Sequence, residues 1–402
     1  MKRNRILHLR ASSFVGGPEH QLLRYAEGQR DSVWDILLAT FVGPEEGREF
    51  IESAEQSGLE TIGLPTDRQL AVRALVQCMR QEDVDVLCTH GYKADILGIV
   101  AARLARVPVA CFLRGWTAEN WRVRAYERAD RWFLPYADRI VCLSNSQATR
   151  LTVRGSLAGK IRVVCNAIDW RKCDENARNR ARIHVRECLQ LPIDCRVVAT
   201  AGRLSPEKGV ADFLLAASRV YPNFPDVRFV IFGSGALRYE LEQQVKNFRL
   251  QDRVTFAGFR RDLQDLLPGI DFLVNPSLSE EMPNILLEAM AFGVPVIATN
   301  VGGVSEIAGP EHSVRLVPPG LPQRLADTIR DLLMDSASAR ELAEAGLRRV
   351  RQVYSLPAQR SQFEALYEEI LFPYAQSSGQ RSRSTQRSDA AAEIGEREVL
   401  TR

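Results

Sequence analysis

Residues 271–299 read DFLVNPSLSEEMPNILLEAMAFGVPVIAT, and this stretch decides the fold. The apolar run 271–275 predicts a strand, residues 284–291 predict a helix, and residues 294–299 predict a second strand. Two apolar strands joined by a helix form a βαβ unit, whose strands are parallel. The stretch therefore predicts an open parallel sheet with helices on its faces.

The same alternation continues outward and forms two series of strands. The first series is expected at 5–9, 35–41, 60–64, 84–88, 109–113, 139–143 and 161–165. The second is expected at 196–201, 228–232, 253–256, 271–275, 294–299 and 314–317. Helices are expected between them, among others at 19–29, 69–80, 94–105, 210–220, 238–248, 284–291 and 322–335. We therefore predict an α/β protein of two doubly wound, Rossmann-like domains that face a cleft, where ligands bind.

The stretch 169–192 separates the two series, because it is charged and poor in strand-forming residues. We place an N-terminal domain at 1–175 and a C-terminal domain at 190–352. Further helical patterns follow up to residue 372. Residues 376–402 are rich in Ser, Arg, Gln and Glu, so we expect a disordered tail.

The composition excludes several classes of protein. The 402 residues are 45% hydrophobic and 26% charged, which is typical of a globular chain. A net charge of +3 is too balanced for a dedicated nucleic-acid binder. No signal peptide or long apolar run is visible, and the 8 cysteines form no C-x-x-C pair, which favours a reducing compartment. We therefore expect a cytoplasmic protein without a transmembrane helix.

In each series, a glycine-containing motif follows the first strand. In SFVGGPE, Gly16 and Gly17 allow close approach of the backbone, and the helix start after them offers N–H groups to an anion. In AGRLSPEKG, Arg203 can donate two hydrogen bonds to a phosphate and Lys208 adds a compact positive charge. Such cations stabilise a diphosphate leaving group.

The stretch 271–299 itself carries two carboxylates at a fixed spacing. Glu280 is expected in the loop after a strand, and Glu288 on the apolar helix that follows. A carboxylate on a buried helix is costly unless it is paired or binds ligand hydroxyls. The glycines that follow neighbouring strands, at Gly233 and at Gly302 and Gly303, again allow close backbone approach.

Together these motifs resemble glycosyltransferase family 4, the large family of retaining glycosyltransferases with the GT-B fold. The similarity extends from residue 1 to about residue 372 and is strongest over 197–306. It implies transfer of a sugar from a nucleotide-diphosphate sugar, with UDP favoured over GDP and without a cofactor or metal ion. The D-x-D sequence at 83–85 precedes its strand, so it would lie at the wrong end of the sheet for a metal site.

The resemblance also implies roles for individual residues. Catalytic roles fall to Arg203 and Lys208 at the diphosphate, Glu280 at the sugar hydroxyls, and His90 near the reaction centre. Donor binding is implied for Gly16, Gly17, Glu288 (at the ribose), Met282, Pro283, Asn284, Gly233 and Arg260. Arg114 and Glu19 are candidate contacts of the acceptor. Residues 166–169 resemble the family's hinge, and the helix within 353–375 would cross back to the N-terminal domain.

Two positions depart from the family pattern. Glu281 follows the first motif glutamate, where the family usually has glycine, and this leaves the identity of the donor sugar open. Cys88 stands where many relatives have histidine, so His90 alone remains of that pair.

The resemblance implies displacement on one face of the sugar, in which a departing phosphate oxygen helps to take the acceptor proton. The expected acceptor is a lipid-linked saccharide or growing glycan of cell-envelope, lipopolysaccharide or exopolysaccharide assembly. Two alternatives stay open, a nucleotide-sugar 2-epimerase of similar fold and a non-catalytic sugar-nucleotide-binding subunit. The P-N-x-x-L-E-A-M-A context of Glu288 argues against the epimerase.

Residues 114–139 combine arginines with aromatic side chains. Such a stretch can form a peripheral contact with an anionic membrane, at the inner face of the membrane in this case. An ordinary helix with an aromatic core face and a basic solvent face explains the same pattern. Both interpretations stay open at the level of sequence.

Overall fold

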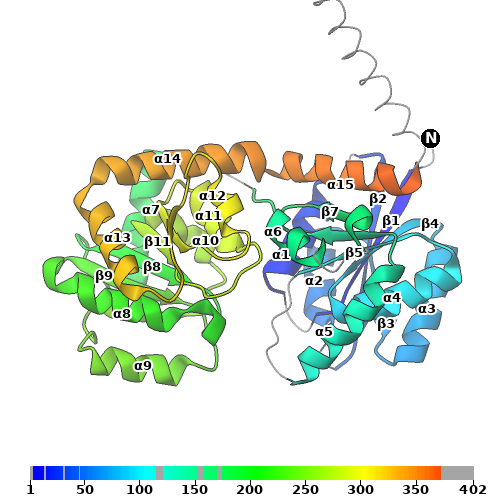
Figure 1. Cartoon of the computed structure of the whole chain (residues 1–402), viewed down its shortest axis with the longest axis horizontal. Helices are drawn as coiled ribbons and strands as arrows, with labels where there is room; N and C mark the ends of the chain where they lie inside the picture. Colours follow the sequence, from blue (N-terminus) through cyan, green and yellow to red (C-terminus); the bar gives the residue numbers. More distant parts are fainter. Residues whose placement is uncertain are drawn as a thin grey trace, which may run out of the picture.

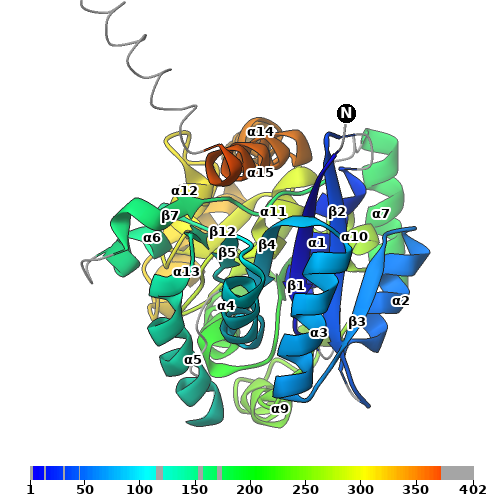
Figure 2. The ribbon, with the colours of Figure 1, turned by 90° about the vertical axis from the view of Figure 1, so that its right-hand side faces the viewer.

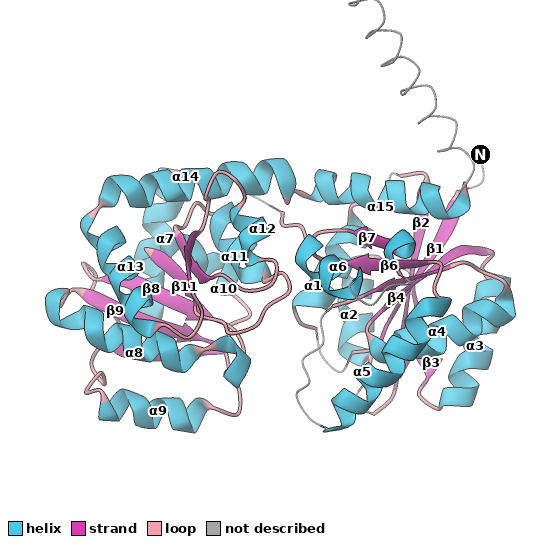
Figure 3. Ribbon diagram, in the orientation of Figure 1, coloured by secondary structure: helices cyan, strands magenta, loops and turns pink. Residues whose placement is uncertain are grey.

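The computed structural model describes residues 3–12, 15–29, 32–44, 46–114, 121–152, 157–169 and 174–372. Figure 1 shows two α/β domains side by side, with two long helices along one side of both. Strands lie at the centre of each domain and helices surround them (Figure 3). The predicted disordered tail, 376–402, lies outside the described residues.

The N-terminal domain contains a parallel sheet of seven strands in the order β3-β2-β1-β4-β5-β6-β7. The strands are β1 (Asn4–Arg10), β2 (Trp34–Val42), β3 (Thr61–Pro65), β4 (Val84–His90), β5 (Val109–Phe112), β6 (Arg139–Cys142) and β7 (Ile161–Val163). The helices are α1 (Gly17–Glu27), α2 (Arg48–Gln56), α3 (Arg68–Gln81), α4 (Tyr92–Ala105), α5 (Trp121–Phe133) and α6 (Asn145–Thr152). The direction of winding reverses between β1 and β4, the point at which such sheets bind ligands.

The C-terminal domain repeats this plan with six parallel strands in the order β10-β9-β8-β11-β12-β13. The strands are β8 (Arg196–Ala201), β9 (Val227–Phe232), β10 (Val254–Gly258), β11 (Phe272–Asn275), β12 (Val296–Thr299) and β13 (Arg315–Val317). The helices are α7 (Glu175–Cys188), α8 (Val210–Val220), α9 (Arg238–Asn247), α10 (Leu263–Leu266), α11 (Asn284–Ala291), α12 (Val304–Ala308) and α13 (Pro322–Met334). Here the winding reverses between β8 and β11. The predicted fold class is confirmed.

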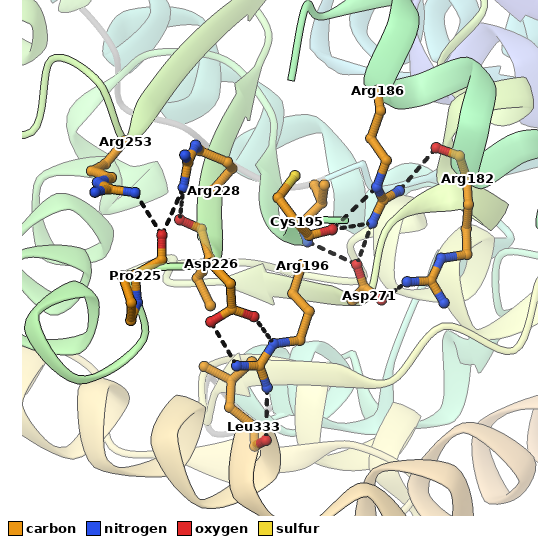
Figure 4. Close-up of polar contacts among 12 residues, drawn as sticks. Arg182, Arg186, Cys195, Arg196, Pro225, Asp226, Arg228, Arg253, Asp271 and Leu333 are labelled. Atoms are coloured by element: carbon orange, nitrogen blue, oxygen red, sulfur yellow. Dashed lines mark hydrogen bonds and ion pairs between the residues drawn. The ribbon is translucent and has the colours of Figure 1, made fainter. Parts of the chain in front are cut away.

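One difference from the sequence analysis is α7, which lies within the stretch that we interpreted as a linker. The carboxylate of Asp174 caps this helix by accepting from the N–H of Ala177 over 2.7 Å. Arg186 on α7 is 1% exposed and donates to Oδ2 of Asp271, at the start of β11, over 2.9 Å (Figure 4). It also donates to the carbonyl of Cys195. These contacts make α7 part of the C-terminal domain.

The last two helices join the domains. Helix α14 (Ser336–Val353) packs on the C-terminal domain, and α15 (Leu356–Leu371) packs on the N-terminal sheet, as Figure 1 shows, while Figure 2 views both end-on. Phe363 and Tyr367 of α15 lie in the core beside Ile6. Where the chain passes between the domains, the N–H of Ile168 donates to the carbonyl of Tyr354 over 2.8 Å. The two passages of the chain therefore run side by side.

Candidate active site

The carboxyl ends of β1 and β4 bring Arg10, Glu19 and His90 together. Nε of Arg10 donates to Oε1 of Glu19 over 2.7 Å, and Nη1 donates to the carbonyl of His90 over 2.9 Å. Oε2 of Glu19 accepts from the N–H of Gly16 over 3.0 Å. Burial acts to raise the pKa of Glu19, but the charge of Arg10 shifts it below its usual value. Glu19, a candidate acceptor contact, is 1% exposed, and its two oxygens hold the turn before α1.

His90 lies at the end of β4 with both ring nitrogens in contact with other side chains. Nδ1 is 3.1 Å from Nη2 of Arg114, and Nε2 is 2.9 Å from Nδ1 of His8. Its ring stacks on Phe112, with centroids 4.7 Å apart. Burial, together with the charge of Arg114, holds the pKa of His90 well below its usual value. His90 is therefore neutral, and Arg114 connects it to the boundary between the domains.

Arg114, two residues after the end of β5, reaches this boundary through Asn166. Its Nη1 donates to Oδ1 of Asn166 over 3.3 Å, and Nδ2 of Asn166 donates to Oδ1 of Asn284 over 2.8 Å. Asn284 is the first residue of α11 in the C-terminal domain, and its Nδ2 donates to the carbonyl of Gly17 over 3.4 Å. Two residues predicted to bind the donor, Gly17 and Asn284, thus meet across the two domains.

The motif after β8 places its two cations differently. Nζ of Lys208 lies 2.5 Å from Oε1 of Glu280, and both side chains are largely buried. The side chain of Arg203 is 51% exposed, with Nη2 3.5 Å from Oε1 of Glu207. Gly209 has a φ of +62°, and a Cβ there would overlap the carbonyl of Pro276. This close approach brings the two loops together, so that Lys208 reaches Glu280.

Neighbouring groups fix the carboxylate of Glu280. Oγ of Ser277 lies 2.8 Å from Oε1 of Glu280 and 2.7 Å from the side-chain oxygen of Asn275. Because the single hydroxyl proton of Ser277 goes to the carboxylate, the amide of Asn275 is better turned so that its NH₂ donates to Ser277. The turned amide also gives a partner to Nδ2 of Asn275, which otherwise has none.

Helix α11 carries the remaining donor residues of the motif. Met282 and Pro283 are buried directly before it, and no side chain caps its N-terminus. Burial raises the pKa of Glu288, while Arg24 of α1 acts in the opposite direction. A half-buried carboxylate at the boundary suits a ligand that donates hydrogen bonds, such as a pair of hydroxyls.

Gly233 and Arg260 belong to the loops that follow β9 and β10. Gly233 has a φ of +122°, and a Cβ there would overlap the carbonyl of Gly202. The close approach that we predicted is thus between two loops of the chain itself. Arg260 donates from Nε and Nη2 to the carboxylate of Asp262 over 2.7 and 2.5 Å. This pairing raises the pKa of Arg260 and orients its guanidinium.

The departure at Glu281 has a structural explanation. Glu281 forms an ion pair with Arg150 of α6, in the N-terminal domain. Beside it, Oε1 of Glu306 accepts from the N–H of Ser146 over 2.7 Å, and Oε2 accepts from the N–H of Asn145 over 2.8 Å. The C-terminal domain thus supplies the cap of α6. We refer to the contacts of Glu281 and Glu306 with α6 as the α6 clasp.

The structure adds residues that the sequence analysis missed. His8 and Tyr367 continue the hydrogen bonds of His90, and Glu306 caps α6. A histidine inside the apolar strand 5–9 was a signal for the first of these. No local pattern marks Tyr367, which is 359 positions away from His8.

Comparison with known proteins identifies the family. The Glycosyl transferase 4-like domain matches residues 16–167, and the Glycosyl transferases group 1 family matches residues 185–349. The chain belongs to the family 4 type of GT-B glycosyltransferases. Among curated proteins it is 32% identical over 240 residues to the UDP-Gal:alpha-D-GlcNAc-diphosphoundecaprenol alpha-1,3-galactosyltransferase of Escherichia coli. That match covers 57% of this chain and 61% of the relative, so the chain spans less than two thirds of it.

Two further proteins are similar over more of their length. The 2-deoxystreptamine glucosyltransferase of Streptomyces kanamyceticus is 29% identical over 292 residues, which cover 68% of this chain and 75% of the relative. The crystal structure of Anabaena HepE in complex with UDP-glucose superposes with a TM-score of 0.78 at 24% identity, covering 91% of this chain and 99% of HepE. At this identity HepE supports the fold, which is the GT-B fold of the family.

The described residues hold no group of three or more His, Cys, Asp or Glu side chains placed to bind a metal ion. Asp83 and Asp85 lie at the amino end of β4, opposite the switch point. Within the same part of the chain, no helix has the length and apolar character needed to span a membrane.

Proposed function

We propose that this protein transfers a sugar from a nucleotide-diphosphate sugar, with UDP favoured over GDP, and that the anomeric configuration is retained without a metal ion. The acceptor in this proposal is a lipid-linked saccharide or growing glycan of cell-envelope or exopolysaccharide assembly. The similar galactosyltransferase of Escherichia coli, whose name states a diphosphoundecaprenol-linked acceptor, supports this class of acceptor. HepE, crystallised with UDP-glucose, supports a UDP-sugar donor.

The observation that carries the proposal is the convergence of donor-type residues at both switch points. Gly17 meets Asn284 across the domains, Lys208 contacts Glu280, and Glu288 lies on the same helix as Asn284. Backbone N–H groups at the uncapped start of α11 and the ammonium of Lys208 suit a diphosphate. The carboxylates suit hydroxyl groups of a sugar and a ribose.

In the proposed mechanism, positioning and charge stabilisation supply the rate. Lys208 and Arg203 stabilise the negative charge that grows on the diphosphate as the glycosidic bond breaks. Glu280 orients the sugar hydroxyls, and a phosphate oxygen of the leaving group takes the proton of the acceptor on the same face. Arg114 and His90 form the wall on the acceptor side, where Arg114 is half-buried and His90 is fully buried. Arg260 is proposed to lie beside the base, held by Asp262.

A thermal-shift panel of nucleotide diphosphates and their sugars tests the proposal. Binding to the folded state raises the melting temperature. At a ligand concentration a hundred times the Kd, the free energy of unfolding increases by about 2.7 kcal/mol. We expect UDP and UDP-sugars to stabilise the wild type and Glu341→Ala, a matched change of an exposed carboxylate on α14. We expect this stabilisation to be lost in Glu288→Ala. No stabilisation by any nucleotide would refute the donor site.

Turnover then separates the alternatives. With a binding donor and an acceptor mixture, the transferase releases nucleotide and forms a new glycosidic bond whose anomeric proton coupling reports retention. Release of a free epimer in the absence of acceptor would identify an epimerase instead. Binding without any turnover would identify a non-catalytic subunit, and loss of activity with EDTA would contradict metal independence.

We also propose that the protein acts in the cytoplasm, at the inner face of the membrane. On α5 and the short helix after it, Leu134–Tyr136, Trp132 is 80% exposed and Tyr136 is 60% exposed, and Leu104 of α4 is exposed as well. Cations border these side chains, since Arg103 donates to the carbonyl of Tyr136 and Lys160 to the carbonyl of Ala137. Exposed aromatic side chains with cations close by suit an anionic lipid surface. Trp116 and residues 115–120 of the predicted stretch 114–139 lie outside the described residues.

A further inference from the structure

A chain of buried polar side chains runs from the domain boundary through the N-terminal sheet to α15. Arg114 contacts His90 at 3.1 Å, His90 contacts His8 at 2.9 Å, and His8 contacts Oη of Tyr367 at 2.9 Å. His8 and Tyr367 are 0% exposed and His90 is 1% exposed. Water cannot satisfy these groups, so each proton must find its acceptor within the chain of contacts.

Arg114 sets the direction at the boundary end of this chain of contacts, because a guanidinium can only donate. Nδ1 of His90 must therefore accept, and a neutral His90 carries its proton on Nε2. This N–H donates to Nδ1 of His8, so His8 also carries its proton on Nε2 and donates to Tyr367. The network thus assigns the same tautomer to both histidines.

Both histidines stay neutral in this arrangement. Burial, with the charge of Arg114 in addition, lowers the pKa of His8 to about 3 and that of His90 well below its usual value. A second proton on either ring would set two N–H groups against each other, or one against the guanidinium. We call the chain of contacts from Arg114 to Tyr367 the relay, and the assignment of its protons the proton order. The relay therefore has one proton order over the whole neutral pH range.

The orientation of the Arg114 guanidinium depends on this proton order, because Arg114 has few other partners. It forms no ion pair with any described residue, its second contact is Oδ1 of Asn166 at 3.3 Å, and its Nε has no partner. Burial lowers the pKa of Arg114 to about 10. The shorter of its two contacts is the one with Nδ1 of His90, at 3.1 Å, and this contact orients the guanidinium.

We propose that Tyr367 of α15 is a positioning residue for Arg114. The hydrogen bond between Tyr367 and Cys88 takes the hydroxyl proton of Tyr367, so this hydroxyl accepts from His8. It therefore holds both histidines in the Nε2–H form and leaves Nδ1 of His90 open to the guanidinium. The inference rests on the proposed function only for what Arg114 does at the acceptor. The proton order itself is a property of the folded chain.

Removal of the Tyr367 hydroxyl acts on Arg114 through the rings of His8 and His90. Without an acceptor at Tyr367, His8 gains by moving its proton to Nδ1, where it faces the N–H of His90. His90 can then pair with His8 only by moving its own proton to Nδ1, and because this N–H cannot pair with a guanidinium, Arg114 loses its contact with His90. The disturbance is passed on because each neutral ring has one proton and two contacts.

The first test measures the tautomers directly, by ¹H–¹⁵N correlation spectra of protein labelled with ¹⁵N-histidine. We expect Nε2–H signals for His8 and His90 in the wild type, unchanged between pH 6 and pH 8. In Tyr367→Phe we expect the Nδ1–H form of His90 to appear. Tyr25→Phe is the matched control, because it removes a buried hydroxyl 2.9 Å from that of Tyr367 but leaves the acceptor of His8 in place. An Nδ1–H signal of His90 in the wild type, or identical spectra of Tyr367→Phe and wild type, would overturn the proposal.

The second test measures turnover of UDP-glucose with acceptor. In Tyr367→Phe we expect kcat to fall about tenfold, the size given by one lost buried hydrogen bond, at an unchanged KM for the donor. His8→Gln keeps an acceptor for His90 and a donor for Tyr367, so it should keep most of kcat, whereas His8→Leu should behave as Tyr367→Phe. Equal losses in Tyr367→Phe and Tyr25→Phe would overturn the proposal in favour of simple packing. If the wild type turns over no donor, the proposed function fails and the tautomer spectra still decide the relay.

Discussion

Nζ of Lys208 lies 2.5 Å from Oε1 of Glu280, so a proposed contact of the diphosphate and a proposed contact of the sugar neutralise each other. The two residues come from the two strand ends at which the winding of the C-terminal sheet reverses. A bound diphosphate must share Lys208 with this carboxylate. Donor binding is therefore coupled to the position of Glu280.

This pairing predicts that Glu280→Gln and Lys208→Met have opposite effects on the binding of UDP. In Glu280→Gln the ammonium loses its carboxylate partner, so we expect UDP alone to bind about fivefold more tightly, as the loss of about 1 kcal/mol of competing attraction gives. In Lys208→Met we expect UDP binding to weaken by at least as much. Isothermal titration with UDP measures both, and turnover of UDP-glucose should fall in both. Weaker UDP binding in Glu280→Gln would contradict competition for Lys208.

The position of Glu280 also depends on Gly302, whose φ is +53° and whose Cβ position overlaps the carbonyl of Glu280. We expect Gly302→Ala to displace the loop of Glu280, with about 3 kcal/mol of lost stability and a loss of UDP binding. Gly320→Ala is the control, because Gly320 has a φ of +68° with nothing within 4 Å of its Cβ position. It should lose only about 1 kcal/mol, from the backbone conformation alone. Urea unfolding and thermal shift with UDP measure the pair; equal effects would show that loop displacement is absent.

The sequence predicted these strand ends well, because their physical signals are local. Apolar runs alternate with helical patterns, so all thirteen predicted strands are found among the described residues. Parallel strands place their carboxyl ends at one edge, which is why Lys208 and Glu280 could be expected near each other. Helix α7 was missed because its surface is charged and only Val185 and Arg186 are buried.

Contacts between distant segments left no such signal. Glu281 and Arg150 are 131 positions apart, and nothing in the sequence around either residue indicates the other. The same holds for His8 and Tyr367, which meet only because α15 crosses back to the N-terminal sheet. A pattern of neighbours predicts elements, whereas the pairing of side chains depends on how complete elements pack.

The two buried histidines predict acid destabilisation in a defined range. Their pKa values are lowered in the folded state, while an unfolded histidine titrates near about 6.5. The stabilisation is therefore present above about pH 6.5 and lost as the pH falls, by about 1.4 kcal/mol per pH unit for each histidine. We expect the free energy of unfolding, from urea titrations at pH 7, 6 and 5, to show this slope. His8→Gln should remove the share of one histidine.

The α6 clasp predicts unequal roles for its two glutamates. In Glu306→Ala the first N–H groups of α6 lose their acceptor, and we expect a loss of about 1 kcal/mol, as for other helix caps. We also expect a larger radius of gyration in small-angle X-ray scattering, because the domains are held at this point. Glu281→Gln removes an ion pair whose arginine is half-exposed, so we expect less than about 1 kcal/mol. A compact Glu306→Ala, or a larger expansion in Glu281→Gln, would speak against a clasp centred on Glu306.

The exposed aromatic side chains at α5 predict binding to anionic lipid. Trp132 and Tyr136 present large apolar surface beside Arg103 and Lys160, so both hydrophobic and electrostatic terms favour an anionic bilayer. We expect co-sedimentation with vesicles of phosphatidylglycerol and phosphatidylcholine, weaker binding to phosphatidylcholine alone, and loss of binding in Trp132→Ser with Tyr136→Ser. Tyr239→Ser is the control, since Tyr239 is 70% exposed on α9 of the other domain. If that control releases the protein from vesicles as much as the double variant does, or if the wild type stays in the supernatant, the surface at α5 is not a lipid contact.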